Sequence, residues 1–409
     1  MAYKLIPGGG VTTPKGFLAG ACYVGVKSRK TEKPDVAMIY SEYPASCAAM
    51  FTTNKFCAAP VILDREILKK GKARAVVVNS GNANAATGEQ GIKNAKLVET
   101  EAEKLLGLGE DEVFVCSTGV IGQQLPVEKV LDGVRRIAPD MSADKGSEAA
   151  WAIMTTDLVR KETALELELS GGTIRIGACA KGSGMIHPNM GTMLCFITTD
   201  CAITHEMLED ALREVVARTF NRVTVDGDTS TNDMCAVLAN GMAGNPLIEW
   251  KDDGYTVFLK ALRQLCQELA RAIAGDGEGA SRLITCAVRE ARSEESAERL
   301  AKAVVGSPLV KAAMFGADTN WGRVLCAMGY SKAPFRPEYV DISFSSAVGA
   351  VAVCRGGMGL DFDEEAARSI LSQDEVVIDV HLHEGEHEAT CWGCDLTYEY
   401  VKINGDYRT

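Results

Sequence analysis

Short apolar runs alternate with amphipathic segments along much of this 409-residue chain, and this alternation most limits the folds open to it. Residues 75–78 (AVVV) form an apolar run that ends in an Asn- and Gly-rich loop, as a buried strand would. Residues 90–109 then have the spacing of a helix that stops at a glycine. A second strand and Gly loop over 111–122, and a second helix over 125–138, repeat the pattern. This order predicts an α/β fold.

Two later segments also have helical spacing. In 204–220, Thr204 is a suitable N-cap, and the helix that follows should bury one apolar stripe. That stripe is made of Met207, Leu208, Ala211, Leu212, Val215 and Val216. Residues 258–275 predict another helix, closed by Gly275.

The C-terminal part of the chain changes its period. Residues 376–382 (VVIDVHL) alternate, with Val376, Ile378, Val380 and Leu382 on one face. A Glu-Gly turn signal and a second alternating run follow, so we predict a β-hairpin and a mixed sheet. No Pro-, Gly- or Ser-rich linker divides the chain, which predicts one folded unit.

Charge, the N-terminal residues and the cysteines limit the partners and the compartment. The formal net charge is −12, which argues against nucleic acid or an anionic membrane as the main partner. The N-terminus lacks a signal-peptide pattern, and no run of about 18 apolar residues predicts a membrane span. The 14 cysteines are scattered through apolar stretches. We therefore expect a cytoplasmic protein with mostly buried thiols.

A group of histidines and cysteines near the C-terminus raises the alternative of a zinc-binding or scaffold protein. Its members are His381, His383, His387, Cys391 and Cys394. A lone C-x-x-C is a weak zinc signal, and in a flat strand it directs the two thiols apart. We interpret the group as a solvated hairpin face and predict no metal.

Four polar loops follow predicted strands or helices, where functional sites and ordinary capped turns look alike. In the first, the Thr118 hydroxyl beside the free N–H of Gly119 offers two donors to a developing oxyanion, although a simple strand-to-loop turn has the same sequence. The four loops are 117–122 (STGVIG), 154–161 (MTTDLVRK), 226–233 (DGDTSTND) and 275–281 (GDGEGAS).

The segment 181–201 (KGSGMIHPNMGTMLCFITTDC) places small, flexible residues directly before Thr192. A Thr hydroxyl becomes a useful nucleophile when a base takes its proton, and the residue's own α-amine can be that base after cleavage of the preceding bond. Gly191 would leave the approach to its carbonyl open. From these residues alone, an ordinary strand start explains the pattern better than self-cleavage does.

The same segment closely resembles the signature of the ornithine acetyltransferase (glutamate N-acetyltransferase) family of arginine biosynthesis. The resemblance continues, in order along essentially the whole chain, in VVNSGNANAATG, CSTGVIG, MTTD, NRVTVDGDTSTND, GDGEGASRLI, FGADTNWGR and WGCDLTYEYVKINGDYRT. It implies an α/β/β/α sandwich that resembles the N-terminal-nucleophile hydrolases in layering but differs in connectivity.

The resemblance also implies self-cleavage between Gly191 and Thr192 into residues 1–191 and 192–409, which remain one folded unit. Thr192 would be the N-terminal nucleophile, and Thr118 and Gly119 the oxyanion hole. The processed chains would assemble as a heterotetramer of two copies of each. One departure is Gly191, where the family usually has Ala, so the rate of cleavage stays open.

The implied activity is transfer of an acetyl group from N-acetylornithine to glutamate, without a cofactor. The resemblance leaves open whether acetyl-CoA is also a donor, and an N-terminal-nucleophile aminopeptidase of related fold is the alternative enzyme. The implied substrate contacts are Thr155 or Thr156, Lys181, Thr192, Glu278, Asn404 and Thr409. Lys181 and Glu278 suit a zwitterionic amino acid, which needs one partner of each sign.

Overall fold

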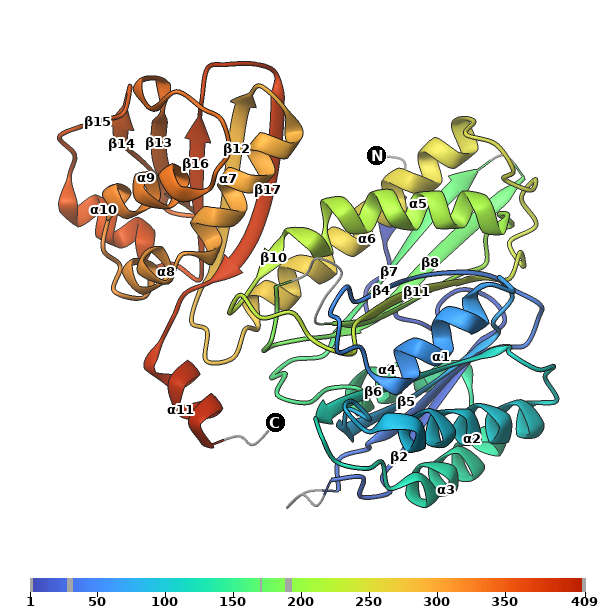
Figure 1. Cartoon of the computed structure of the whole chain (residues 1–409). Coiled ribbons are helices and arrows are strands. Elements are labelled where there is room, and N and C mark those ends of the chain that lie inside the picture. The colour runs from blue at the N-terminus through green and yellow to red at the C-terminus, as the bar shows by residue number, and fades with distance from the viewer. Residues whose placement is uncertain (1–2, 28–31, 170, 188–192, 407–409) are drawn as a thin grey trace.

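The computed structural model describes residues 3–27, 32–169, 171–187 and 193–406, which fold into two lobes and a C-terminal helix (Figure 1). The larger lobe contains two sheets packed face to face. Its six-stranded sheet has the order β1-β7-β8-β9-β11-β4, in which only the β9–β11 pair is parallel. These strands are β1 Tyr3–Leu5, β4 Ser46–Phe51, β7 Lys161–Leu169, β8 Gly172–Lys181, β9 Leu194–Thr199 and β11 Met234–Ala239.

The second sheet of this lobe has four strands in the order β2-β3-β5-β6, with β5 and β6 parallel. They are β2 Phe17–Cys22, β3 Val36–Ser41, β5 Ala75–Asn82 and β6 Val113–Val120. Phe17 and Phe114 from this sheet and Phe196 from the other are at most 1% exposed and fill the core between the two sheets. Burial of such large apolar side chains is the main favourable term in folding.

Helices cover both outer faces of the paired sheets. The long helices α5 His205–Arg218 and α6 Asp253–Gly275 share a core with β8 and β9. On the opposite side, α2 Gly88–Leu106 and α3 Val127–Ile137 share a core with β3, β5 and β6. The shorter α1 Ala59–Leu68 and α4 Gly146–Ala152 pack beside the sheets. The predicted α/β/β/α layering is therefore confirmed.

The smaller lobe is built on a seven-stranded mixed sheet of order β10-β17-β12-β16-β13-β14-β15. Its strands are β10 Val223–Thr224, β12 Leu283–Ala291, β13 Asp341–Ser346, β14 Gly349–Arg355, β15 Met358–Gly359, β16 Glu375–His381 and β17 His387–Cys394. Its helices are α7 Glu294–Gly306, α8 Pro308–Phe315, α9 Trp321–Tyr330 and α10 Glu364–Leu371. The short strand β10 comes from the chain of the larger lobe and so joins the two.

The predicted C-terminal hairpin is wrong. Strands β16 and β17 exist, but β12 lies between them, parallel to β16 and antiparallel to β17. The alternating face was predicted correctly, because Val376, Ile378, Val380 and Leu382 are all buried. Local alternation identifies the strands and their faces, but a strand from far earlier in the sequence decides their neighbours.

The two cysteines of the C-x-x-C lie on opposite sides of this sheet. Cys391 is buried in the core of the smaller lobe, whereas Cys394 belongs to the core that α6 covers. His381 and His383 stack on each other at the surface, 5.9 Å between ring centroids. Across the described ranges, no group of three or more His, Cys, Asp or Glu side chains is arranged to hold a metal ion.

The remaining local predictions agree with the observed elements. Thr204 caps α5 by accepting from the Met207 N–H, and the stripe of that helix is buried apart from the half-buried Met207. Gly107 ends α2 in the left-handed conformation. Over the described part of the chain, no helix combines the length and apolarity needed to cross a bilayer.

Candidate active site

A cavity of about 260 Å³ lies where loops of the larger lobe meet the C-terminal helix α11 (Tyr398–Asp406). Its wall includes residues from the end of β6, the loop after α4, the end of β8 and the loop after α6. The structure thereby brings together seven residues that the sequence predicts as site residues. They are Thr118, Gly119, Thr155, Thr156, Lys181, Glu278 and Asn404.

Three further predicted residues, Gly191, Thr192 and Thr409, lie outside the described residues. The described chain resumes at Met193, whose carbonyl accepts a hydrogen bond of 3.0 Å from the Met234 N–H. Strand β9 starts one residue later, and its Leu194 pairs directly with Lys181 of β8. The chain that follows position 192 therefore lies beside the strand end that brings Lys181 to the cavity.

Gly119 can occupy its place only because it lacks a side chain. Its φ is +134°, and a Cβ there would lie 2.3 Å from the carbonyl carbon of Gly81 on the neighbouring strand β5. The pairing of β5 with β6 is irregular at this point, around Asn82. Such irregularities redirect backbone groups away from the ladder, which brings the Thr118–Gly119 peptide to the cavity.

The polar loop 226–233 is fastened against the end of β6. The Asn232 side-chain amide donates to the carbonyls of Ala83 and Ser117, at 2.6 and 2.8 Å. Earlier in the same loop, Asp226 accepts from the backbone N–H groups of Met185 and Ile186 at 2.6 and 2.8 Å. The loop therefore connects the oxyanion-hole candidates with the segment that leads toward residue 191.

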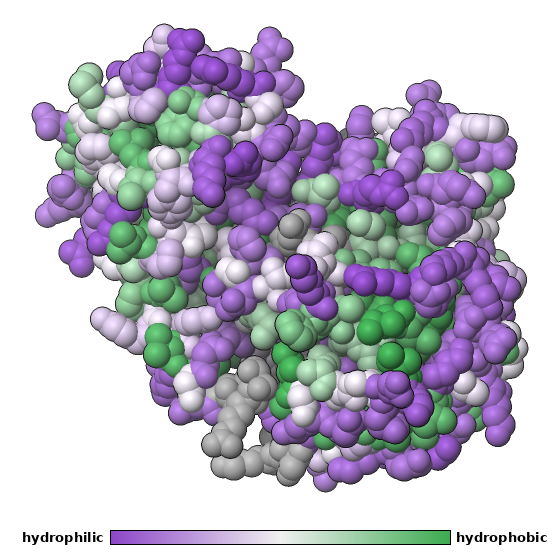
Figure 2. All heavy atoms as spheres, in the orientation of Figure 1, coloured by the Kyte–Doolittle hydropathy of each residue, from purple (hydrophilic) through white to green (hydrophobic). Residues whose placement is uncertain are grey.

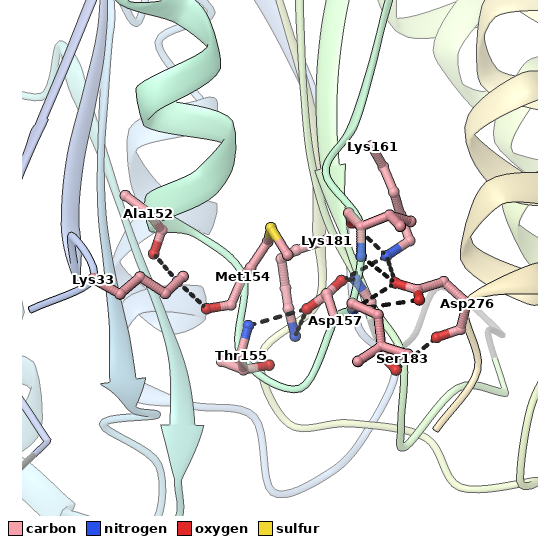
Figure 3. Close-up of polar contacts among 12 residues, drawn as sticks. Lys33, Ala152, Met154, Thr155, Asp157, Lys161, Lys181, Ser183 and Asp276 are labelled. Atoms are coloured by element: carbon pink, nitrogen blue, oxygen red, sulfur yellow. Dashed lines mark hydrogen bonds and ion pairs between the residues drawn. The ribbon is translucent and has the colours of Figure 1, made fainter. Parts of the chain in front are cut away.

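A buried ionic cluster lies beside Lys181 (Figure 3). The Lys161 ammonium is 2.8 Å from Asp157 Oδ1 and 2.5 Å from Asp276 Oδ2. The Lys181 ammonium lies 4.0 Å from Asp157 Oδ2. Burial alone would raise the pKa of Asp157, but the two lysine charges outweigh it and hold that pKa well below its usual range. Asp157 is therefore a carboxylate at neutral pH.

The side of the cavity near α11 carries acidic and amide groups. Asn404 Nδ2 donates to Glu278 Oε2 at 2.8 Å, and the Tyr400 hydroxyl donates to Asp226 at 3.3 Å. Burial, reinforced by the Asp226 charge, raises the pKa of Tyr400, so this hydroxyl keeps its proton. Together with Lys181, the cavity presents one ammonium, carboxylates and neutral donors.

Sequence reasoning did not single out Asp157, Lys161, Asp226, Asp276 or Tyr400. Four of them lie within three of the four polar loops that could be either site or turn, and all four loops contribute residues to the cavity wall. The polar loops could be recognised in the sequence, but their composition did not distinguish a functional site from an ordinary capped turn. The contact between Lys161 and Asp276 spans 115 positions, which no local pattern reveals.

The fold and this cavity define an α/β/β/α protein with a polar cavity lined by a lysine, carboxylates and neutral hydrogen-bond donors. Residues 18–409 match the ArgJ family, and the chain belongs to that family. The family resemblance inferred from the motifs is therefore confirmed.

Curated proteins and solved structures are similar to this chain. The "Arginine biosynthesis bifunctional protein ArgJ" of Symbiobacterium thermophilum is 51% identical over 98% of this chain and 99% of its own length. A crystal structure of the protein of that name from Bacillus halodurans is 45% identical, with a TM-score of 0.50, and covers 52% of this chain and 98% of its own. An ornithine acetyltransferase from Mycobacterium tuberculosis, solved in complex with ornithine, is 38% identical and covers 46% of this chain and 98% of its own, with a TM-score of 0.42.

Proposed function

We propose that this chain transfers an acetyl group from N-acetylornithine to glutamate through an acetyl-Thr192 intermediate. As a member of the ArgJ family, the chain is an acetyltransferase of arginine biosynthesis, as its motifs predict. This assignment favours acetyl transfer over the aminopeptidase alternative. The observation that supports the proposed site is the convergence of seven predicted residues on one cavity.

The cavity chemistry suits an acetylated amino acid. We propose that the Lys181 ammonium binds the substrate carboxylate, and that Glu278, oriented by Asn404, binds the side-chain ammonium of ornithine. Thr155 or Thr156 would contact the remaining polar atoms, and Thr409 is proposed as a further contact. The roles of these residues come from the family resemblance. The shared cavity supports them for all but Thr409, which lies outside the described residues.

The proposed reaction has two halves. The Thr192 hydroxyl attacks the acetyl carbonyl, and its α-amine, a type of group whose ordinary pKa is about 7.7–8.0, takes the hydroxyl proton. The oxyanion accepts hydrogen bonds from Thr118 and Gly119. When the C–N bond breaks, the proton passes to the departing amine and releases ornithine. Glutamate then attacks the acetyl ester, which gives N-acetylglutamate and restores Thr192.

The free α-amine requires cleavage between Gly191 and Thr192, giving residues 1–191 and 192–409. We propose that the Thr192 hydroxyl makes this cut by an N→O acyl shift followed by hydrolysis. The half-length chain of the Bacillus halodurans structure supports the proposal, since either product would have about that length. Strands from both sides of position 191 share one sheet, so the products would stay together.

Three broader features complete the proposal. Glutamate would also be acetylated from acetyl-CoA, in keeping with the word "bifunctional" in the names of the relatives.

The processed chains would form a heterotetramer. Large apolar residues such as Phe56 and Ile62, exposed in the region of α1, offer a surface for assembly (Figure 2). A cytoplasmic location fits the 14 free cysteines.

Steady-state kinetics test the proposed activity. Varying N-acetylornithine at several fixed glutamate concentrations should give the parallel double-reciprocal lines of a ping-pong mechanism. Thr192→Ala should remain uncleaved and inactive, because the same hydroxyl performs both reactions. Intersecting lines, or activity in Thr192→Ala, would contradict the mechanism. Replacing N-acetylornithine by acetyl-CoA in the same assay tests the second donor.

A further inference from the structure

Two carboxylates and a lysine from separate parts of the larger lobe form a buried cluster behind the cavity (Figure 3). The Lys161 side chain at the start of β7 and the Asp157 side chain in the preceding loop are fully buried, and that of Asp276 is 6% exposed. Asp276 also accepts from the Leu158 N–H at 3.1 Å. Buried charges persist when each has a partner of opposite sign, and Lys161 has two.

Asp157 connects this cluster to two of the segments that bear predicted substrate contacts. Its Oδ1 accepts from the Gly182 N–H at 2.7 Å, directly after Lys181. Its Oδ2 accepts from the Thr155 N–H at 3.0 Å. One carboxylate therefore sets the loop 154–161 against the end of β8.

Lys181 faces the same carboxylate, but its ammonium lies too far away for a hydrogen bond. Its side chain is 8% exposed, and its ammonium lies 4.0 Å from Asp157 Oδ2, which is the outer limit of an ion pair. Both Asp157 oxygens already accept shorter hydrogen bonds. Within the described residues, the Lys181 ammonium donates no hydrogen bond, so its protons remain available for an anionic group in the cavity.

We propose that Asp157 is a positioning residue for the acetyl-transfer reaction: it fixes the Lys181 ammonium at the cavity wall so that Lys181 binds the substrate carboxylate. Asp157 balances the charge of Lys181 at a distance that still leaves the ammonium its donors. Lys161 and Asp276 hold Asp157 in place from behind. This inference rests on the proposed function, because it assumes that Lys181 contacts the substrate.

Asp157→Asn tests the proposal, because it keeps the shape of the side chain and removes its charge. We expect KM for N-acetylornithine and for glutamate to rise about tenfold or more, since small displacements of a binding group are costly, while kcat falls much less. Rates are expressed per Thr192 N-terminus, determined by intact mass, so that incomplete cleavage does not affect the comparison.

The matched control is Asp200→Asn. Asp200 is also buried and accepts two backbone N–H groups, from Arg175 at 2.7 Å and Lys15 at 3.2 Å, but it lies toward the opposite end of β8. The Asp200→Asn variant should have a lower thermal denaturation midpoint than the wild type and unchanged KM values for both substrates. If both variants lose stability and neither changes KM, Asp157 is only structural and the proposal is wrong.

A double-mutant cycle with Lys181→Met separates this inference from the proposed function. If Asp157 acts through Lys181, Asp157→Asn adds little to the KM of Lys181→Met, whereas independent effects would add. Additive effects overturn the inference alone. A wild-type enzyme that transfers no acetyl group overturns the proposed function. If Asp157→Asn does not fold, Asp157→Glu, which displaces the charge by one methylene group, should raise the same KM values, and unchanged values would contradict the proposal.

Discussion

At the residue scale, Gly119 combines a close backbone contact with a place in the cavity wall. Gly119→Ala combines a positive φ with a 2.3 Å approach to the backbone of β5, so the free energy of unfolding should fall by about 2–4 kcal/mol. Gly122→Ala is the control, because Gly122 also has a positive φ (+79°) but open space around it, so about 1 kcal/mol is expected. Urea unfolding measures both. Equal losses would show that the approach to Gly81 does not constrain Gly119.

His187, the last described residue before position 193, links stability to pH. Burial, with a smaller contribution from the Lys302 charge, lowers its pKa to about 4 against a nearby Asp228 that opposes the shift. The unfolded chain therefore binds more protons than the folded one between pH 4 and about 6.5. The free energy of unfolding is therefore highest, as far as His187 is concerned, above about pH 6.5, and it decreases as the pH falls toward 4.

We expect His187→Gln to weaken this dependence. Urea midpoints of the wild type and the variant should differ in how much they fall between pH 7 and pH 4.5, with the smaller fall in the variant. Identical slopes in the two proteins would exclude His187 as a source of the acid sensitivity.

At the scale of secondary-structure elements, the loop after β8 and the loop after α6 lie in contact at the cavity. Gly184 lies so close to Glu278 that an added Cβ would stand 2.3 Å from the Glu278 carboxyl group. Because the obstructed atoms end a flexible side chain, Gly184→Ala should displace that carboxylate at little cost in stability. We expect KM for N-acetylornithine to rise several-fold, by an amount on the order of 1 kcal/mol of lost binding. Gly329→Ala in α9, with open space at that position, should leave KM unchanged.

Some secondary-structure elements could be predicted from the sequence alone, and others could not. The helix over 204–220 and the strand that begins at Ala75 were predicted because their apolar periods and end signals are local. The hairpin failed because β12 separates β16 from β17, and no feature of the two strands encodes that neighbour. The site residues were predicted from family motifs, whereas the Lys161–Asp276 contact needed the fold.

At the scale of the whole molecule, charged residues connect the two lobes. Arg222, in the turn after α5, pairs with Glu294 and Glu298 of α7, at 2.7 and 3.1 Å. The Arg222 side chain is only 8% exposed, and its loss leaves Glu298 without its ion-pair partner, while Glu294 keeps its contact with Arg218 at 2.9 Å. Arg222→Met should lower stability by about 1.5–3 kcal/mol, whereas Arg213→Met, at an exposed pair within α5, should cost at most about 0.5 kcal/mol. Equal thermal shifts would argue against this role for Arg222.

The layered architecture and the two-lobe division also differ in how predictable they were. The alternation of strands and helices, with the family resemblance, predicted the α/β/β/α lobe. The second lobe was not foreseen, because the chain passes from α6 to β12 through a loop too short to be recognised as a linker between lobes. That same loop carries Glu278 to the cavity, so the connection between the lobes also forms part of the cavity wall.

The central claim is that Thr192 becomes an N-terminal nucleophile that carries the acetyl group. Intact-mass analysis of the purified protein, with and without N-acetylornithine and in the absence of glutamate, tests it most directly. We predict two chains, 1–191 and 192–409, with the second one acetyl group heavier after exposure to substrate. Addition of glutamate should remove that group. A single uncleaved chain with full acetyltransferase activity, or turnover without an acetylated 192–409 chain, would contradict the account.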